Sequence, residues 1–122
     1  MTYKKAKIDS KKAFLAGDKT FIQELLHPKN DGINLPYSIA HGTLEKGCSS
    51  LPHILEETKE LYIFLKGRGI LLIEGEEIAV ESGDLVVVPG GAKQHLVNTG
   101  NQILEFFCIV SPPWDNQKEV IC

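Results

Sequence analysis

The chain has 122 residues, of which 43% are hydrophobic and 24% are charged, and its formal net charge at pH 7 is −3. This composition is typical of a single globular domain and excludes a disordered or low-complexity chain. Lys and Arg are scattered along the sequence, so no basic surface is predicted and a nucleic-acid partner is not expected. No apolar run approaches the roughly 18 residues of a membrane-spanning helix, so a membrane partner is not expected either.

The three cysteines are Cys48, Cys108 and Cys122. An odd number of cysteines without regular spacing predicts reduced thiols rather than a disulfide framework. The charged N-terminus is not followed by an apolar segment, so we expect no signal peptide. These observations together predict a cytoplasmic protein.

The residues before about position 37 form the least regular part of the chain. Within them, residues 20–26 fit two interpretations. They predict either a short helix opened by a Thr20/Gln23 capping box or a strand with alternating apolar positions. We prefer the strand, followed by a loop over residues 27–32. An N-terminal arm is therefore expected over about residues 1–36.

From about residue 37, short apolar segments alternate with turns that contain Gly or Pro. The expected strands cover residues 37–44, 60–65, 70–73, 77–80, 85–88, 94–98 and 103–110. Short strands at intervals of about ten residues, without alternating helices, predict an all-β sandwich or barrel. The barrel core is expected over about residues 37–110, followed by a C-terminal tail over residues 111–122.

Two spaced patterns lie inside this region. The first pattern consists of Gly47, five residues, His53, one residue, Leu55, four residues, Glu60, six residues and Gly67. The second consists of Gly83, five residues, Pro89, one residue, Gly91, two residues, Gln94, three residues and Asn98. In this order they resemble the two sequence motifs of the cupin superfamily. The resemblance implies an antiparallel double-stranded β-helix, the jelly-roll cupin barrel.

The resemblance also implies a metal site inside the barrel. In metal-binding cupins, three His and one Glu hold one divalent cation. Here His53 and Glu60 occupy two of these positions, while Leu55 stands at the second His position and Gln94 at the last. The implied cofactor is a divalent transition metal, and Zn, Fe, Mn, Ni and Co all suit imidazole, carboxylate and amide donors.

Another histidine is needed to complete such a site. His41 is the best candidate, because it lies on the expected strand that leads into the first motif. His95 follows Gln94 directly, and a one-residue step along a strand reverses the side chain, so His95 is expected to face away. A similar Ser-x-Ala-His strand, together with Leu55, Gln94 and the ending Cys108 to Trp114, resembles a group of small single-domain cupins. Members of that group are often named only as cupins or sugar-phosphate isomerases.

The lining of the expected cavity follows from strand parity. Tyr62 and Phe64 share the parity of Glu60, so they are expected to line the ligand pocket together with Leu55. Plain core packing is the alternative for both aromatic residues. Trp114 is expected to cover the barrel or a subunit contact.

Two functions remain open from the sequence. One is a metal-dependent enzyme of the isomerase or dioxygenase type, acting on a small polar molecule such as a sugar phosphate or an organic acid, with its catalytic residues unknown. The other is a non-catalytic cupin that binds a small molecule without metal, in which Leu55 marks an apolar pocket. A purely structural role fits the polar motif residues least well. The resemblance and the need to cover sheet edges also predict a homodimer.

Overall fold

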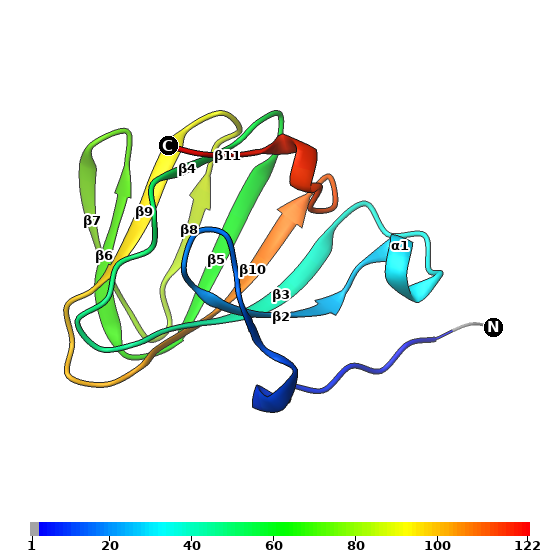
Figure 1. The fold of residues 1–122 in the computed structure, drawn as a ribbon, viewed down its shortest axis with the longest axis horizontal. Helices are drawn as coiled ribbons and strands as arrows, with labels where there is room; N and C mark the ends of the chain where they lie inside the picture. The colour runs from blue at the N-terminus through cyan, green and yellow to red at the C-terminus, as the bar shows by residue number, and fades with distance from the viewer. Residues whose placement is uncertain (1–2) are drawn as a thin grey trace.

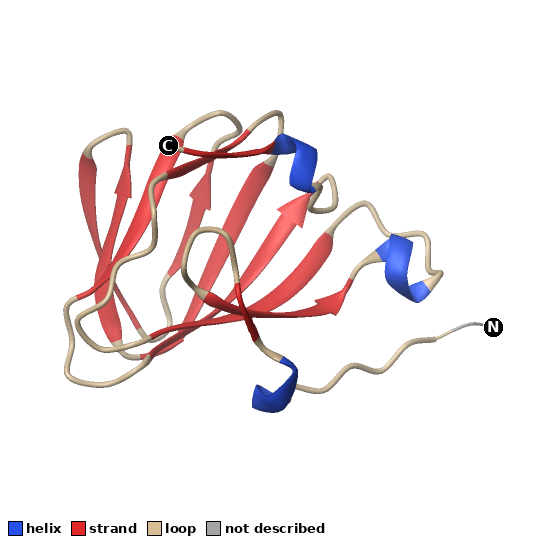
Figure 2. Ribbon diagram, in the orientation of Figure 1, coloured by secondary structure: helices blue, strands red, loops and turns tan. Residues whose placement is uncertain are grey.

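The structure is a computed structural model that describes residues 3–122. Strands make up about half of the described residues, and two antiparallel sheets form the barrel (Figures 1 and 2). The six-stranded sheet has the order β1-β2-β3-β10-β5-β8, and the five-stranded sheet has the order β11-β4-β9-β6-β7. This architecture confirms the all-β jelly-roll prediction.

The first sheet contains β1 (Phe14–Leu15), β2 (Phe21–Leu26), β3 (Ser38–Leu44), β10 (Leu104–Ser111), β5 (Lys59–Lys66) and β8 (Leu85–Val88). The second contains β11 (Glu119–Ile121), β4 (His53–Leu55), β9 (Lys93–Asn98), β6 (Arg68–Ile73) and β7 (Glu76–Glu81). The helices of the described residues are short: η1 (Ser10–Lys12), α1 (Pro28–Asp31) and η2 (Asn116–Lys118). None of these is long or apolar enough to cross a membrane.

Each of the seven expected strands is present, with ends that differ by at most two residues from the expected ones. The segment with two interpretations is the strand β2, as preferred. Residues 27–32, expected as a loop, contain the short helix α1 instead. His27 caps this helix, because its Nδ1 accepts a hydrogen bond from the Lys29 backbone N–H at 3.1 Å, and Gly32 ends it with a φ of 66°.

The sheets extend beyond the expected barrel core of residues 37–110. At the N-terminal side, β1 and β2 add two strands to the edge of β3. At the C-terminal side, β11 pairs with β4, so the expected tail contributes a strand to the second sheet (Figure 1). The short strand β11 depends on pairing with a partner distant in sequence, which local patterns do not reveal.

The apolar core fills one end of the barrel. Along β5, Glu60, Tyr62 and Phe64 all point inward, as strand alternation predicts. The register of β5 against β10 places Phe64 beside Phe106 and Glu60 beside Val110. Phe64 and Phe106 belong to the buried core cluster, whereas Glu60 lies toward the opposite end. The functional site is built at that opposite end.

One glycine is required by this packing. Gly42 on β3 lies opposite Phe106 on β10. A Cβ atom at position 42 would overlap the Phe106 ring. The absence of a side chain at this position therefore lets the aromatic ring lie against the β3 backbone.

Candidate functional site

A cavity of about 260 Å³ opens at the end of the barrel opposite the apolar core, and we call it the barrel cavity. Its lining residues are Phe14, Ala16, Gly17, Asp18, Ile22, Glu24, Ser38, Ala40, His53, Leu55, Glu60, Cys108, Val110, Trp114 and Glu119. Four of these residues are acidic and one is a histidine. No Lys or Arg occurs among the described residues that line the cavity. The barrel cavity is therefore acidic on its polar side.

His53 is the buried imidazole of the barrel cavity, with only 3% of its surface exposed. It lies on β4, directly opposite Gln94 on β9. Its Nδ1 lies 3.0 Å from the backbone carbonyl oxygen of Leu51. A carbonyl only accepts hydrogen bonds, so Nδ1 carries the proton and Nε2 keeps a lone pair. Among the described residues, Nε2 has no hydrogen-bond partner, which leaves it available as a ligand atom.

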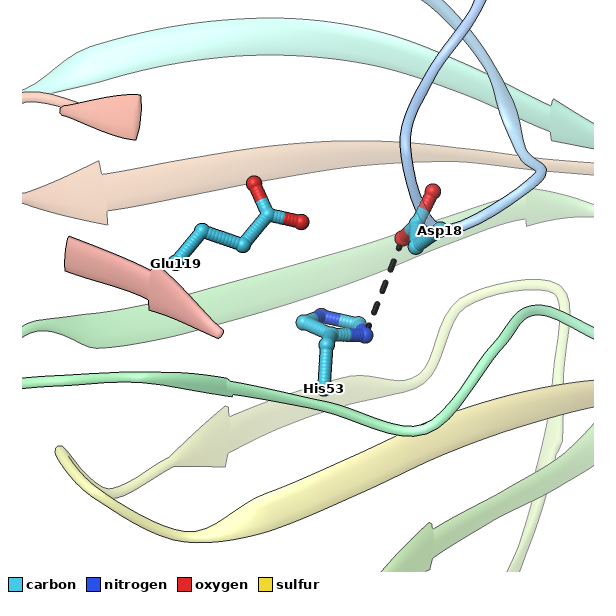
Figure 3. A group of neighbouring side chains, drawn as sticks. All are labelled: Asp18, His53 and Glu119. Atoms are coloured by element: carbon cyan, nitrogen blue, oxygen red, sulfur yellow. Dashed lines mark ion pairs between the residues drawn. The ribbon is translucent and has the colours of Figure 1, made fainter. Parts of the chain in front are cut away.

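Two carboxylates from outside the motifs lie beside this imidazole. One ligand atom each of Asp18, His53 and Glu119 lies within 4.8 Å of the others, and we call these residues the cavity triad (Figure 3). A carboxylate oxygen of Asp18, Oδ2, lies 3.8 Å from His53 Nδ1. Figure 3 shows the His53 ring facing the carboxylates of Asp18 and Glu119. An imidazole and two carboxylates thus converge on one region of the cavity.

Hydrogen bonds hold one oxygen of each of these carboxylates. The Thr20 backbone N–H and hydroxyl both donate to Asp18 Oδ1, at 3.1 and 2.6 Å. The Trp114 indole N–H donates to Glu119 Oε2 at 3.0 Å. Each carboxylate is therefore oriented by one oxygen and keeps the other oxygen available. Ligands of a metal ion are commonly oriented by such secondary hydrogen bonds.

The backbone explains how residues so distant in sequence meet. Asp18 lies in the turn between β1 and β2, and its carbonyl accepts a hydrogen bond from the Leu51 backbone N–H at 2.6 Å. Glu119 begins β11, which places it directly opposite Leu55 on β4. Both termini of the barrel are thereby tied to the short segment that carries His53.

Behind the triad, Gln94 joins Glu60 and Tyr62 in a buried network. The Tyr62 hydroxyl donates to Gln94 Oε1 at 2.8 Å, and Gln94 Nε2 donates to Glu60 Oε1 at 2.9 Å. The amide oxygen of Gln94 is therefore already an acceptor in this network. Gln94 points into the barrel as expected, but its hydrogen bonds give it a structural role rather than a free ligand atom.

Burial dominates the electrostatics of these inner groups. Burial raises the pKa of Glu60, and nearby Asp18 raises it further, while His53, Cys108 and Gln94 partly offset the increase. Burial also raises the pKa of Tyr62 and of the Cys108 thiol well above their ordinary values. Tyr62 and Cys108 are therefore protonated at neutral pH.

His41 does not reach the barrel cavity. Ser38 and Ala40 on β3 line the cavity, so alternation places His41 on the outer face of the sheet. There its Nε2 lies 2.7 Å from Glu105 Oε2, and its ring makes an edge contact with Phe107 at a centroid distance of 5.8 Å. The expectation that His41 completes the ligand set is thus corrected, because the position has the wrong parity on β3.

The remaining predicted residues separate into cavity and core. Leu55 lines the barrel cavity as expected, but Tyr62 and Phe64 do not. Both aromatic rings pack in the core, stacked on each other at a centroid distance of 5.6 Å. His95 is only half-buried on β9, between the inward-facing Gln94 and the next inward-facing residue, as strand parity predicts.

Sequence reasoning missed Asp18, Glu119 and the contribution of Trp114. Asp18 follows a glycine in a turn, and Glu119 lies in a charged terminal segment. Such acids are usually exposed, so no local signal distinguishes them. Only the pairing of β11 with β4, and of the β1–β2 turn with residue 51, brings them to His53.

A larger hollow of about 380 Å³ lies outside the barrel, between α1 and the C-terminal segment. Its histidine, His27, is fully engaged. His27 Nε2 donates to the Trp114 carbonyl at 2.8 Å while Nδ1 caps α1. The chemistry-bearing residues of the two motifs lie in the barrel cavity instead.

Two antiparallel sheets that enclose a cavity lined in part by polar residues define a jelly-roll β-barrel. The model of the Cupin domain family matches residues 40–110, which is more than half of the chain. The chain therefore belongs to the cupin family.

Three similar proteins extend this comparison. An uncharacterized protein of Methanocaldococcus jannaschii is 30% identical over 117 residues, which cover 96% of this chain and 93% of that protein. An oxalate-binding protein of Thermotoga maritima is 31% identical over 67 residues, 55% of either chain. The crystal structure of a predicted oxalate decarboxylase from Thermotoga maritima has a TM-score of 0.69 and 26% identity, and the match covers 76% of this chain and 80% of that one.

Proposed function

We propose that this cupin binds one divalent metal ion at the cavity triad of Asp18, His53 and Glu119, and that the ion binds a small organic acid in the barrel cavity. The observation that carries the proposal is the convergence of three ligand atoms within 4.8 Å. The hydrogen bonds from His53 to the Leu51 carbonyl, from Thr20 to Asp18 and from Trp114 to Glu119 support it, because they orient all three side chains.

The side chains of the cavity triad suit a transition metal better than the ligand set predicted from the sequence does. Gln94 is engaged in the buried network, and His41 lies on the other face of the sheet. The cavity triad offers one imidazole and two carboxylates, which suits Mn, Fe, Co, Ni or Zn without selecting among them. Three protein ligands leave positions open, and a metal ion bound there supplies a Lewis acid that binds and polarises an oxygen atom of the ligand.

The charge of the cavity supports a bound cation. Glu24 and Glu60 add two further carboxylates to the lining, and no Lys or Arg among the described lining residues balances them. A sugar phosphate would bring two negative charges into this acidic cavity, so an organic acid held by the metal is the better fit. The Thermotoga maritima proteins named for oxalate are consistent with an organic acid.

The test is metal binding by protein purified without a metal-binding tag. We expect elemental analysis to find about one transition-metal ion per chain, and chelator-treated protein to rebind Mn²⁺ or Zn²⁺ in calorimetry. Asp18→Asn and Glu119→Gln should each weaken binding by at least about tenfold, since each removes a charged ligand. Glu105→Gln, changed on the outer face of the sheet, is the matched control. Equal affinity in all three variants would overturn the proposed ligand set.

Metal-free binding is the second candidate function. It is favoured by Leu55, an apolar residue at a ligand position of the first motif. If chelated protein does not bind either metal ion, this candidate replaces the first.

A further inference from the structure

We infer that the ligand of the barrel cavity is a small monocarboxylic acid with a hydrocarbon body, rather than a polyol, a phosphate ester or an acid with a second carboxylate at its far end. The inference rests on the proposed metal site and names the class of molecule that the site selects. It follows from where the polar and apolar atoms of the cavity lie.

The apolar side of the cavity is formed by residues of five strands and of the segment after β10. These residues are Phe14, Ile22, Ala40, Leu55, Val110 and Trp114. Leu55 and Val110 are each only 5% exposed and form the inner wall, whereas Phe14 is 58% exposed. A hydrocarbon body that contacts these side chains is removed from water, which stabilises the complex.

The polar side offers one place for a negatively charged group. The metal ion proposed at the cavity triad is the only proposed cation. The remaining acidic residues of the lining, Glu24 and Glu60, would face any second carboxylate. The Ser38 hydroxyl oxygen already accepts a hydrogen bond from the Trp114 backbone N–H at 2.9 Å. An anionic group at the far end of a ligand would therefore be buried without a cation, which is unfavourable. The site can compensate a carboxylate that reaches the ion, but not a second one that lies away from it.

The size of the cavity limits the hydrocarbon body. At about 260 Å³, it is smaller than the pockets of roughly 300–1,000 Å³ that hold drug-sized ligands. A short alkyl chain or a single ring fits this limit. A nucleotide or a long fatty acid does not.

The experiment uses full-length protein loaded with Mn²⁺, with calorimetry as the measurement. The probes are acetate, butanoate, hexanoate and benzoate, compared with adipate, which has the chain length of hexanoate and a second carboxylate at the far end. Each added methylene should tighten binding by about threefold to fourfold until the cavity is filled. Adipate should bind at least about tenfold more weakly than hexanoate.

Variants connect this dependence to the cavity wall. Leu55→Asn should remove most of the gain from chain length while Mn²⁺ affinity is retained, and Leu85→Asn, changed at an exposed position, should retain the gain. Ala40→Ser is a second variant at the wall, with a smaller change, in case Leu55→Asn does not fold. Loss of chain-length dependence in either folded wall variant supports the inference.

Three outcomes would overturn it. Binding of adipate to the Mn²⁺ form as tightly as hexanoate contradicts the ligand class but leaves the metal site in place. Affinity for the monocarboxylates that does not depend on their chain length also contradicts the ligand class and leaves the metal site in place. If Mn²⁺ does not bind and hexylammonium binds the metal-free protein instead, the proposed function and this inference are both wrong.

Discussion

Glu119 lies directly opposite Leu55 in the antiparallel pair of β11 and β4, and both residues line the barrel cavity. Directly opposed residues of two strands project to the same face. The C-terminal strand thus brings a carboxylate beside the position where the cupin pattern has a second histidine. In the proposed site, Glu119 supplies a ligand beside position 55, where this chain has an apolar side chain.

This relationship predicts the effect of restoring a histidine at position 55. Leu55→His should place an imidazole beside Glu119 and raise the number of protein ligands from three to four. We expect Zn²⁺ affinity to increase by about tenfold or more, measured by competition with a chromophoric chelator. Leu85→His adds a histidine at an exposed position and is the control. Unchanged affinity in Leu55→His would show that this wall of the cavity lies too far from the bound ion.

The elevated pKa of Glu60 predicts a pH-dependent stability. Its pKa lies above the ordinary value of 4.5 in the folded protein because the carboxyl group is buried. As the pH rises above 4.5, the unfolded chain loses this proton first, so this residue lowers the free energy of unfolding progressively as the pH rises. Glu60→Gln removes the titration. The variant should therefore gain stability relative to the parent as the pH rises above 4.5.

Urea denaturation in the presence of a chelator measures this difference without a contribution from metal. Glu77→Gln, changed at an exposed position on β7, serves as the control. The prediction is contradicted if the difference in free energy of unfolding between Glu60→Gln and the parent stays constant as the pH rises above 4.5. It is also contradicted if the parent becomes the more stable of the two with rising pH.

His41 is expected to contribute to stability and not to metal binding. It contacts Glu105 at 2.7 Å on the outer face of the sheet. His41→Ala should lower the free energy of unfolding by about 1 kcal/mol, since Glu105 is partly exposed and solvent screens the pair. Metal affinity should stay within about twofold of the parent. A large loss of metal occupancy in this variant would mean that His41 acts on the site.

A double-mutant cycle with Glu105→Ala separates the pair from the other contacts of His41. The two substitutions should be less than additive, because each removes the same interaction. Full additivity would assign the stabilisation to Phe107 packing instead.

Gly42 is predicted to be intolerant of even a methyl group. A Cβ at this position would overlap the Phe106 ring in the core. Gly42→Ala should therefore destabilise the protein by about 1–3 kcal/mol, measured by chemical denaturation. Phe106→Leu, which shortens the opposing side chain, should reduce the cost of Gly42→Ala. An equal cost in both backgrounds would place the strain elsewhere.

The sequence by itself determined the all-β class and the inward-facing motif positions. Alternation along β5 and β9 placed Glu60 and Gln94 inside and His95 outside, because the side-chain period of a strand is two. The turns with Gly and Pro located seven strands to within two residues of their ends. These features are local, so the local pattern of residues is enough to predict them.

Tertiary structure alone decided which donor atoms meet. Asp18 and Glu119 lie 101 positions apart in the numbering and belong to short elements whose pairing depends on distant partners. His41 lies on the outer face of the sheet because it alternates with Ser38 and Ala40, which line the cavity. The number of residues between His41 and the first motif does not predict that face. Side chains combine into a site through strand pairing across the whole barrel, and that pairing is a property of the packed fold rather than of any segment.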